Sequence, residues 1–476
     1  MPLIQEGVIM KLLFKVICVL ILTLHLNFCT EKKTPTEPPS IYDENGLLTD
    51  EGLRTPEDSN APTEKADWID WIKTNSIPIR SLTVEFFTDL EALIPYLENI
   101  KYVQLGESGH GVAEFNKAKV RLIKFLHQEL GYDVIAFESS IFECFYANQN
   151  VSTFDDLDLM YNSIFGVWHT KEVRKLFTYI KNSAETAHPL ILAGFDTQIS
   201  SSLGSAKRPD FFKEIISKVD PTYADQIYAL DTEFTQNFYK TNYLESKQDT
   251  LITQYNNLVD FFDNNMSEIT ALYPDNPRIP LIARQTAWSM PRFIRQIIFR
   301  NEQDYDSSTE TRDKGMADNF EYLASNVYPD KKIMLWAHNF HIRHNNSAVS
   351  GVKTMGTYIA QNHETDLYTI GLFMYRGKAA WNNRVIYEIE PAKSGSLESI
   401  FYRARKKYCY VDMSNEEQND GNSWMFQTIT CKSWGTGDLQ MILKDQYDGI
   451  LFIDTVNPPQ YLYDYSKNMI SKSFTP

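Results

Sequence analysis

The chain has few basic residues for its length. Its 476 residues include 46 lysines and arginines against 62 aspartates and glutamates, which gives a formal net charge of −16 at pH 7. Nucleic-acid phosphates would repel such a surface, so the composition argues against a nucleic-acid partner. It argues equally against charge-driven docking on anionic lipid headgroups. With 43% hydrophobic and 23% charged residues, the sequence otherwise matches an ordinary globular protein with a large core.

Cysteine is also scarce, with five residues in the whole chain. Cys18 and Cys29 lie in the N-terminal segment, and no cysteine–histidine cluster has zinc-finger spacing. Cys144 lies in an apolar run and is predicted to be a buried free thiol. Cys409 and Cys431 could pair in an oxidising compartment, which their spacing alone does not settle. Cysteine usage therefore gives little support for or against export.

A conspicuous apolar run, residues 16–24, is too short for a membrane span. It lies close behind Lys11 and Lys15, as in a signal peptide, and a cysteine directly after such a core is typical of a bacterial lipoprotein. We predict that residues 1–29 are a lipoprotein signal peptide, with cleavage before Cys29 and lipid on its sulfur. The protein would then be exported, would face the periplasm or the cell surface, and would touch the membrane only through this lipid. A secretory signal cut nearby and an uncleaved anchor are the alternatives.

The remaining chain divides into a tether and one domain. Residues 30–62 are rich in proline, threonine, serine and acidic residues, which predicts a disordered tether. Residues 63–476 alternate between strand and helix patterns, with strands predicted at 102–105, 134–137, 190–193, 332–336 and 367–373, and further candidates at 385–387, 408–412 and 449–454. Unalternating apolar runs such as 134–137 indicate strands that are buried on both faces, as in parallel sheets.

The segment from about 209 to 324 shows no strand pattern and is predicted to be a helical insertion or cap. Pro291 is expected to kink or divide one of its helices, and Arg312 is expected to open the last one. The fold class that follows is α/β, with a largely parallel sheet built from two βαβ-like half-units and this helical insertion.

Four of the predicted strands run into ionisable side chains. These are Glu107 and His110 after 102–105, Glu138 after 134–137, Asp196 after 190–193, and His338 and His341 after 332–336. Because the carboxyl ends of parallel strands meet at one edge of a sheet, where open α/β folds bind ligands, these side chains are expected to converge. Carboxylates and histidines gathered there predict an acid–base site.

His110 is the predicted general base, because neutral imidazole can take a proton from water. Glu107, three residues earlier, and Glu138, on what is expected to be the next strand, would orient and polarise it. Lys119 lies at the edge of the apolar stripe of the following helix. It either extends to solvent or reaches the site, where it would hold an anion or tune the carboxylates.

The second half-unit contributes His338, which would hold the substrate, donate a proton or stabilise an oxyanion. His341, Asp196 and Trp168 are candidates for contact with the substrate. The predicted partner is a small-molecule ester or lactone, and the set needs no cofactor for hydrolysis by activated water.

Two other mechanisms remain open. His338-x-x-His341 with His110 and a glutamate has ligand types suited to a divalent metal, although these histidines lie in a predicted loop rather than in a helical His-Glu-x-x-His motif. Ser108 could be a nucleophile, but Gly106-Glu-Ser-Gly-His110 departs from Gly-x-Ser-x-Gly at its last position. His110, two residues along the turn, is poorly placed to activate that serine.

Several motifs together resemble the erythromycin esterase family over roughly residues 67–454. They are Leu105-Gly-Glu-Ser-Gly-His110, Glu114-Phe115, Glu129-Leu-Gly-Tyr132, Ile135-Ala-Phe-Glu138, Arg312-Asp313 with Met316-Ala317, and Trp336-Ala-His-Asn339 with His341. The resemblance implies hydrolytic ring opening of macrolide lactones, and with it antibiotic resistance. It also implies an active centre with His110 and Glu107, and roles for Glu138, Lys119 and His338. Family members that hydrolyse macrolides carry arginine at the Lys119 position. Lysine supplies a point charge instead of the two parallel donors of a guanidinium group, so the resemblance does not fix the substrate.

The alternative to an enzyme is a non-catalytic surface lipoprotein that has the same fold and binds a ligand.

Overall fold

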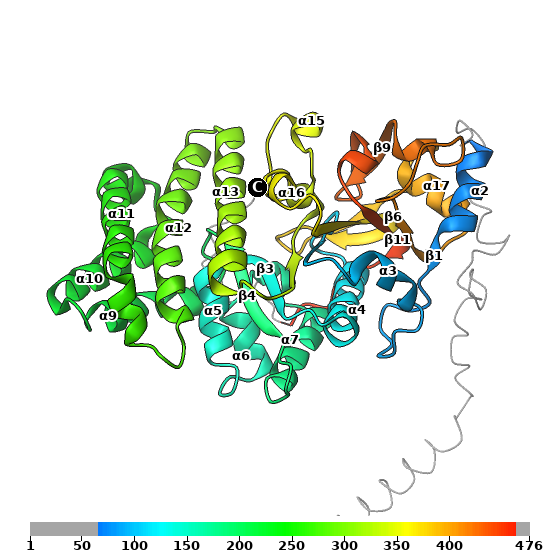
Figure 1. Ribbon diagram of the computed structural model, residues 1–476. Coiled ribbons are helices and arrows are strands. Elements are labelled where there is room, and N and C mark those ends of the chain that lie inside the picture. The colour runs from blue at the N-terminus through cyan, green and yellow to red at the C-terminus, as the bar shows by residue number, and fades with distance from the viewer. Residues whose placement is uncertain (1–64, 463–476) are drawn as a thin grey trace, which may run out of the picture.

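A nine-stranded sheet runs through the described part of the chain, residues 65–462, in the computed structural model (Figure 1). The predicted signal peptide and tether lie outside the described residues. The strand order is β1 (Ile77–Pro78), β8 (Tyr408–Asp412), β11 (Gly449–Val456), β6 (Leu367–Ala380), β2 (Tyr102–Leu105), β5 (Ile333–Trp336), β3 (Val134–Ser140) and β4 (Ile191–Asp196), with β7 (Ile386–Ile389) paired to β6. The strands from β11 to β4 are parallel, whereas β1, β8 and β7 pair antiparallel. The predicted α/β fold with a largely parallel sheet is confirmed.

Two βαβ units interlock at the centre of the sheet. The first runs from β2 through α4 (Ala113–Leu130) to β3, and the second runs from β5 through α16 (Met355–Asn362) to β6. Because β5 lies between β2 and β3, and β2 lies between β5 and β6, the units are interleaved rather than adjacent. The turn after β2 and the turn after β5 therefore lie side by side, although they are far apart in sequence.

Apolar residues on alternate positions of these strands pack on opposite faces of the sheet. Ile135 and Phe137 pack on the side of α4, and Val134 and Ala136 pack on the other side. Helix α4 buries Phe115 against the first face. It ends at Gly131, whose left-handed conformation (φ 69°) suits glycine at the end of a helix. The three-layer packing leaves the carboxyl ends of the strands as the edge where polar residues can gather.

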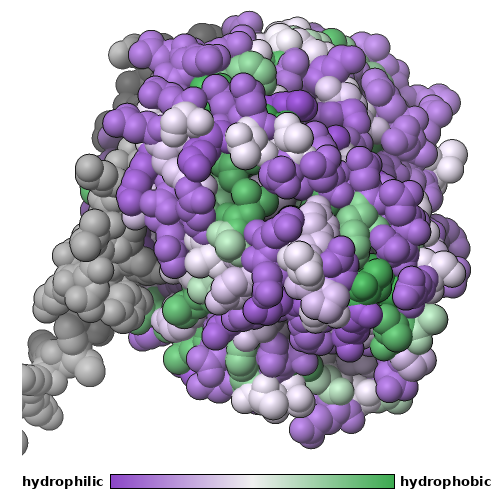
Figure 2. Space-filling view, turned by 90° about the vertical axis from the view of Figure 1, so that its left-hand side faces the viewer, coloured by the Kyte–Doolittle hydropathy of each residue, from purple (hydrophilic) through white to green (hydrophobic). Residues whose placement is uncertain are grey.

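The segment between β4 and β5 is helical throughout its described elements. It contains α8 (Ser202–Ser205), α9 (Arg208–Ile216), α10 (Pro221–Asn237), α11 (Thr241–Ala271), α12 (Arg278–Asn301) and α13 (Tyr305–Tyr322), followed by a π-helical turn at Leu323–Val327. These helices stand at one end of the molecule (Figure 1) and have a core of their own that includes Phe234, Tyr255 and Phe293. Hydrophilic residues dominate the outer face of this end, and apolar ones form only small groups (Figure 2).

The other elements complete the faces and edges of the sheet. They are α2 (Ala66–Asn75), α3 (Ile94–Leu97), α5 (Ile141–Gln149), α6 (Asp156–Tyr161), α7 (Lys171–Ser183), α14 (Asn339–Ile342), α15 (Ser347–Ser350), α17 (Leu397–Arg403) and the hairpin β9 (Thr428–Ser433)–β10 (Gly437–Ile442). No helix within residues 65–462 has the length and apolar character needed to cross a membrane. Cys144, Cys409 and Cys431 are buried free thiols, so the prediction for Cys144 is confirmed and the other two do not pair.

Two local predictions about the helical segment differ from the structure. Of the two effects predicted for Pro291, a kink or a division, division does not occur, because α12 continues through it from Arg278 to Asn301. Packing of α12 between α11 and α13 offsets the cost of an internal proline, about 3 kcal/mol. Arg312 does not open a helix but lies in the middle of α13. A third difference concerns β3, which extends beyond Phe137 to Ser140 and so contains Glu138.

Candidate functional site

The turn after β2 and the turn after β5 form the site together. Leu105 pairs with Trp336 in the sheet, and the Asn339 backbone N–H donates to the Glu107 carbonyl oxygen at 2.8 Å. A side chain at Gly106 would collide with that of Asn339, so the close approach of the turns requires glycine there. This contact fixes the relative position of the two histidine-bearing segments.

Glu107 and His110 form a hydrogen-bonded pair at the centre of the site. His110 Nδ1 lies 2.6 Å from Glu107 Oε1, and the indole N–H of Trp168 donates to the same oxygen at 2.9 Å. Lys119 Nζ lies 2.9 Å from Glu107 Oε2. With every neighbour of the carboxylate acting as a donor, His110 donates through Nδ1, and its lone pair lies on Nε2. No residue in the described chain hydrogen-bonds to that Nε2, and the His110 side chain is 13% exposed.

Lys119 reaches the site and does not extend to solvent. Its side chain is completely buried, and Nζ lies 4.1 Å from the centroid of the Trp336 ring and donates to the Ala337 carbonyl. Burial lowers the pKa of Lys119 to about 8, against the opposing attraction of Glu107. The ammonium group therefore remains mostly charged at neutral pH and anchors Glu107 beside His110.

His338 faces His110 from the neighbouring turn. The ring centroids lie 5.1 Å apart. His338 Nδ1 accepts a hydrogen bond from the Phe340 backbone N–H at 3.1 Å, which places the proton of the neutral ring on Nε2. Burial, with further contributions from His110 and His341, lowers the pKa of His338 well below its ordinary value. His338 is therefore a neutral donor whose buried Nε2 has no partner among the described residues.

A second charged cluster lies behind His338. Arg312 donates to Asp196 through Nε and Nη2, and Nη2 also donates to Glu138 at 2.7 Å. His341 Nδ1 lies 2.8 Å from Asp313, while its Nε2 lies 3.3 Å from Glu138 and 3.1 Å from Arg312. Arginine only donates, so the neutral His341 ring accepts from Arg312, and the protonated ring donates to Glu138 instead.

The electrostatics of this cluster favour the charged forms of Glu138 and His341. Burial by itself would raise the pKa of Glu138, but His341 and Arg312 outweigh it and hold that pKa well below its usual range. Burial would likewise lower the pKa of His341, and Asp313 and Glu138 raise it instead. The Glu138 carboxylate also accepts from the His338 backbone N–H at 3.0 Å, so the cluster holds the second histidine turn in place.

Glu138 interacts with His110 by charge and not by a hydrogen bond. β5 lies between β2 and β3, so Glu138 hydrogen-bonds to the turn of β5, which carries His338 and His341. Attraction to His110 still contributes to the lowered pKa of Glu138. The three side chains predicted to contact substrate are buried and have protein partners at or behind the site. Trp168 is 1% exposed and supports Glu107, and Asp196 is fully buried against Arg312. His341 is 8% exposed and is bound within the same cluster.

Three residues at or near the site were not assigned from the sequence. Arg312 and Asp313 were recognised only as part of a family motif, and other charged residues on the same helix, such as Glu310 and Lys314, hide them in the sequence. Trp434, in the turn of the β9–β10 hairpin, packs on both His110 and His338. The hairpin itself was not predicted, and nothing in the local pattern marks Trp434.

The arrangement bears on the two other mechanisms considered. The Ser108 hydroxyl oxygen is buried and has no hydrogen-bond partner among the described residues, so no base is placed on it. Within residues 65–462, no three His, Cys, Asp or Glu side chains are grouped so that they could hold a metal ion. The donor atoms of His341 and Glu138 already engage Asp313 and Arg312.

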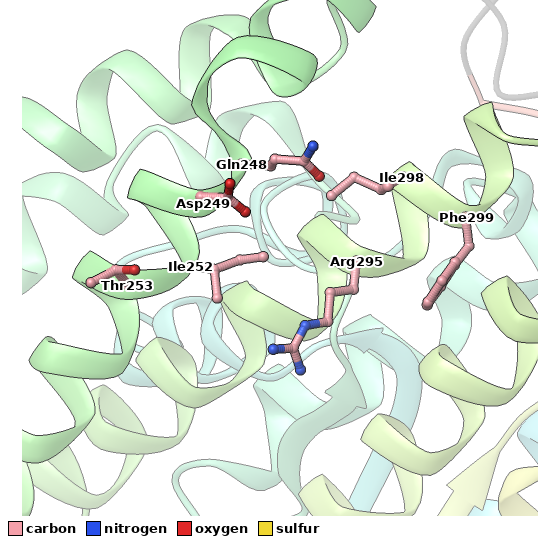
Figure 3. Close-up of a pocket in the computed structure, with 7 residues that line it drawn as sticks. All are labelled: Gln248, Asp249, Ile252, Thr253, Arg295, Ile298 and Phe299. Atoms are coloured by element: carbon pink, nitrogen blue, oxygen red, sulfur yellow. The ribbon is translucent and has the colours of Figure 1, made fainter.

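A hollow of about 510 Å³ lies elsewhere, between α11 and α12 (Figure 3). Its lining includes Ile252, Arg295 and Phe299 but no histidine. It lies within the helical end and not at the strand ends, so its size does not mark it as the place where the acid–base groups converge. The chemistry of the Glu107–His110–His338 group identifies the candidate site.

Comparisons with known proteins agree on one family. Residues 127–456, well over half of the chain, match the family described as Erythromycin esterase. The candidate hydrolase YbfO of Bacillus subtilis (strain 168) is 31% identical over 421 residues, which are 84% of this chain and 93% of YbfO.

Solved structures share the fold. A protein from Bacillus cereus has a TM-score of 0.72 at 17% identity, over 84% of this chain and all of that one. A mutant of erythromycin esterase EreC in its open conformation has a TM-score of 0.60 at 19% identity, over 80% of this chain and 96% of EreC. The sequence matches extend this likeness from fold to family: the chain belongs to the erythromycin esterase family and is a hydrolase.

Proposed function

We propose that the protein hydrolyses carboxylic esters or lactones with a water molecule activated by His110. The observation that carries the proposal is the Glu107–His110 pair, in which three donors fix the carboxylate and leave the His110 Nε2 lone pair unused. A histidine in this state is a general base, and such bases contribute roughly 10²–10⁴-fold to rate.

The reaction balances with water as the only co-reactant. His110 Nε2 takes a proton from water as its oxygen attacks the carbonyl carbon, and the imidazolium that forms is stabilised by Glu107. The tetrahedral intermediate then breaks the carbon–oxygen bond to the leaving group. His110 returns the proton to the leaving alkoxide, which yields the acid and the alcohol, or the hydroxy acid from a lactone.

His338 supplies the complementary donor. Its neutral ring carries a proton on a buried Nε2 that lacks a partner in residues 65–462, so it can donate to the oxyanion without first losing another hydrogen bond. A donor placed in this way typically contributes about 10²–10³-fold. Glu138 and Arg312 act indirectly: Glu138 accepts from the His338 backbone N–H, and Arg312 holds Glu138 in place.

The substrate class follows from the family and stays a proposal. EreC is named an erythromycin esterase, so macrolide lactones belong among the compounds to be tried. We further propose that the enzyme is anchored outside the cytoplasm by lipid on Cys29, which lies outside the described residues. Small-molecule esters in that compartment are then its partners.

The test is hydrolysis by purified protein of simple esters, lactones and macrolides, with ¹⁸O-water to show attack by solvent. His110→Ala should reduce the rate at least about 10²-fold. His188→Ala is the matched control, because His188 is 44% exposed and pairs with Asp133 at the opposite ends of the strands. Equal activity of the native protein and His110→Ala would refute the proposal. Chelation followed by elemental analysis tests the metal-dependent alternative. Activity that persists after chelation, in protein with no bound metal, would exclude it.

A further inference from the structure

The turn of the β9–β10 hairpin has an unusual backbone. Three residues, Trp434 to Thr436, connect the paired Ser433 and Gly437. The first two have positive φ angles, 56° at Trp434 and 71° at Gly435, and the Thr436 N–H donates to the Ser433 carbonyl at 3.1 Å. Two positive φ angles and this hydrogen bond describe a type I′ turn, in which asparagine, aspartate or glycine is preferred at the first central position. A bulky tryptophan there is a true outlier, and such residues persist where the surrounding structure requires them.

The surrounding structure ties this strained residue to the catalytic turn. The Trp434 N–H donates to the Ser108 carbonyl at 2.7 Å, and the Tyr387 hydroxyl donates to the Trp434 carbonyl at 2.7 Å. A Cβ on Gly109 would lie 3.3 Å from the Trp434 ring. The hairpin is therefore fastened directly to the segment that carries Glu107 and His110.

The indole ring of Trp434 lies against both catalytic imidazoles. It stacks on His338, with centroids 5.2 Å apart and planes 26° apart, and it meets His110 at 82° and 5.3 Å. The aromatic series continues outward. Trp381 lies 5.5 Å from Trp434, and it stacks on Tyr387 at 4.0 Å and 20°. Trp381 is 37% exposed, although large apolar side chains are usually buried.

Closing the hairpin does not by itself require tryptophan at position 434 or an exposed Trp381. A turn with asparagine would close the hairpin at lower conformational cost, and Trp381 would gain more from burial than from exposure. What the rings do share is a continuous series of ring contacts from the exposed Trp381 to His110 and His338. Apolar aromatic side chains with a few convergent polar groups are the usual lining of a small-molecule site.

We propose that Trp434 and Trp381 form an aromatic subsite that binds a flat aromatic ring of the ester and sets its specificity. The inference rests on the proposed hydrolysis, because the subsite adjoins the groups that would carry it out. A ring laid on the exposed side of this Trp381–Trp434 pair brings the attached carbonyl group toward His110 and His338. Each aromatic contact contributes about two- to tenfold to the affinity for such a ring.

The kinetic experiment compares benzyl acetate with ethyl acetate, and uses cyclohexylmethyl acetate to separate aromaticity from size. Trp434→Asn creates the Asn-Gly pair that a type I′ turn prefers, so the hairpin should keep its fold. The expected result is about a tenfold fall in the benzyl-to-ethyl ratio of kcat/KM, carried by KM for the benzyl ester. Trp434→Phe should restore part of that ratio. Thr436→Ala, an exposed change in the same turn, should leave it unchanged.

Equilibrium binding separates this inference from the proposed hydrolysis. 4-Phenylbutan-2-one and pentan-2-one replace the bridging oxygen of the two esters with carbon, so they bind without reacting, and calorimetry measures their affinities. A native preference for the phenyl ketone that Trp434→Asn removes supports the subsite even if no ester is hydrolysed. The subsite is refuted if the native protein does not prefer the phenyl ketone, or if Trp434→Asn keeps the same preference. An equal loss of rate on all three esters would also refute it.

Discussion

The Glu107–Lys119 pair should separate stability from catalysis. Both side chains are completely buried, with Nζ 2.9 Å from Oε2. Glu107→Gln keeps the shape of the side chain but leaves the Lys119 charge without its anion, and breaking one side of a buried pair costs about 3–5 kcal/mol of unfolding free energy. Lys119→Met should cost a similar amount, because it leaves the Glu107 carboxylate without its cation.

The double variant Glu107→Gln/Lys119→Met should recover most of that loss. Replacing both members of a buried pair with neutral side chains of similar volume is often close to neutral for stability. Methionine retains a favourable contact with the Trp336 ring, over which Lys119 Nζ lies at 4.1 Å. The glutamine oxygen still accepts from Trp168 and His110. It no longer supplies the negative charge that stabilises the His110 imidazolium, so hydrolysis should stay about 10²–10⁴-fold below the native rate.

The assay is urea unfolding followed by tryptophan fluorescence, together with kcat/KM on the best ester. A double-mutant cycle with a coupling of about 3 kcal/mol or more is expected. Stability losses that simply add in the double variant would refute the buried pair. Recovery of hydrolysis together with stability would refute the electrostatic role of Glu107.

Further predictions concern pH and location. Because burial lowers the pKa of Lys119 to about 8, kcat should fall above that pH, and Lys119→Arg, which stays charged, should remove this alkaline limb from the pH–rate profile. The pKa of His341 is raised above its ordinary value of 6.5, so the stability from its carboxylate partners is complete below that value and is lost as pH rises through the folded pKa. Asp313→Asn should therefore lower the urea midpoint more at pH 6 than at pH 9, and equal shifts would contradict the assignment. Cys29→Ala should move the protein from the membrane fraction to the soluble fraction, whereas unchanged membrane association would rule out the lipid anchor.

The pairing of charged groups shows where sequence reasoning reached its limit. Glu107 and His110 are three residues apart on one turn, so their contact depends on local geometry that the sequence implies. Glu138 was expected beside His110 because β3 follows β2 along the chain. The insertion of β5 between them gives Glu138 to His338 and His341 instead. Strand order depends on which faces pack best over the whole chain, and no local pattern reports it.

Trp434 shows the same limit more sharply. Its hairpin follows a short 3₁₀ turn, and its backbone conformation is one that tryptophan rarely adopts. The two histidines that it contacts both lie more than ninety positions earlier. Lys119 is an intermediate case. Its place on the edge of an apolar stripe was visible in the sequence, but its direction was decided by Glu107 and the Trp336 ring.

The sequence by itself determined the strands of the parallel core, the main helices and the polar residues at the strand ends, because hydrophobic period and turn chemistry act over a few residues. It also determined the glycine turn that carries Glu107 and His110. Only the tertiary structure decided the interleaving of the two βαβ units, the partner of each carboxylate, the tautomer of His338 and the position of Trp434 against the two histidines. Those features arise from contacts between segments that are distant in sequence. The free energy of each contact depends on how the whole domain packs.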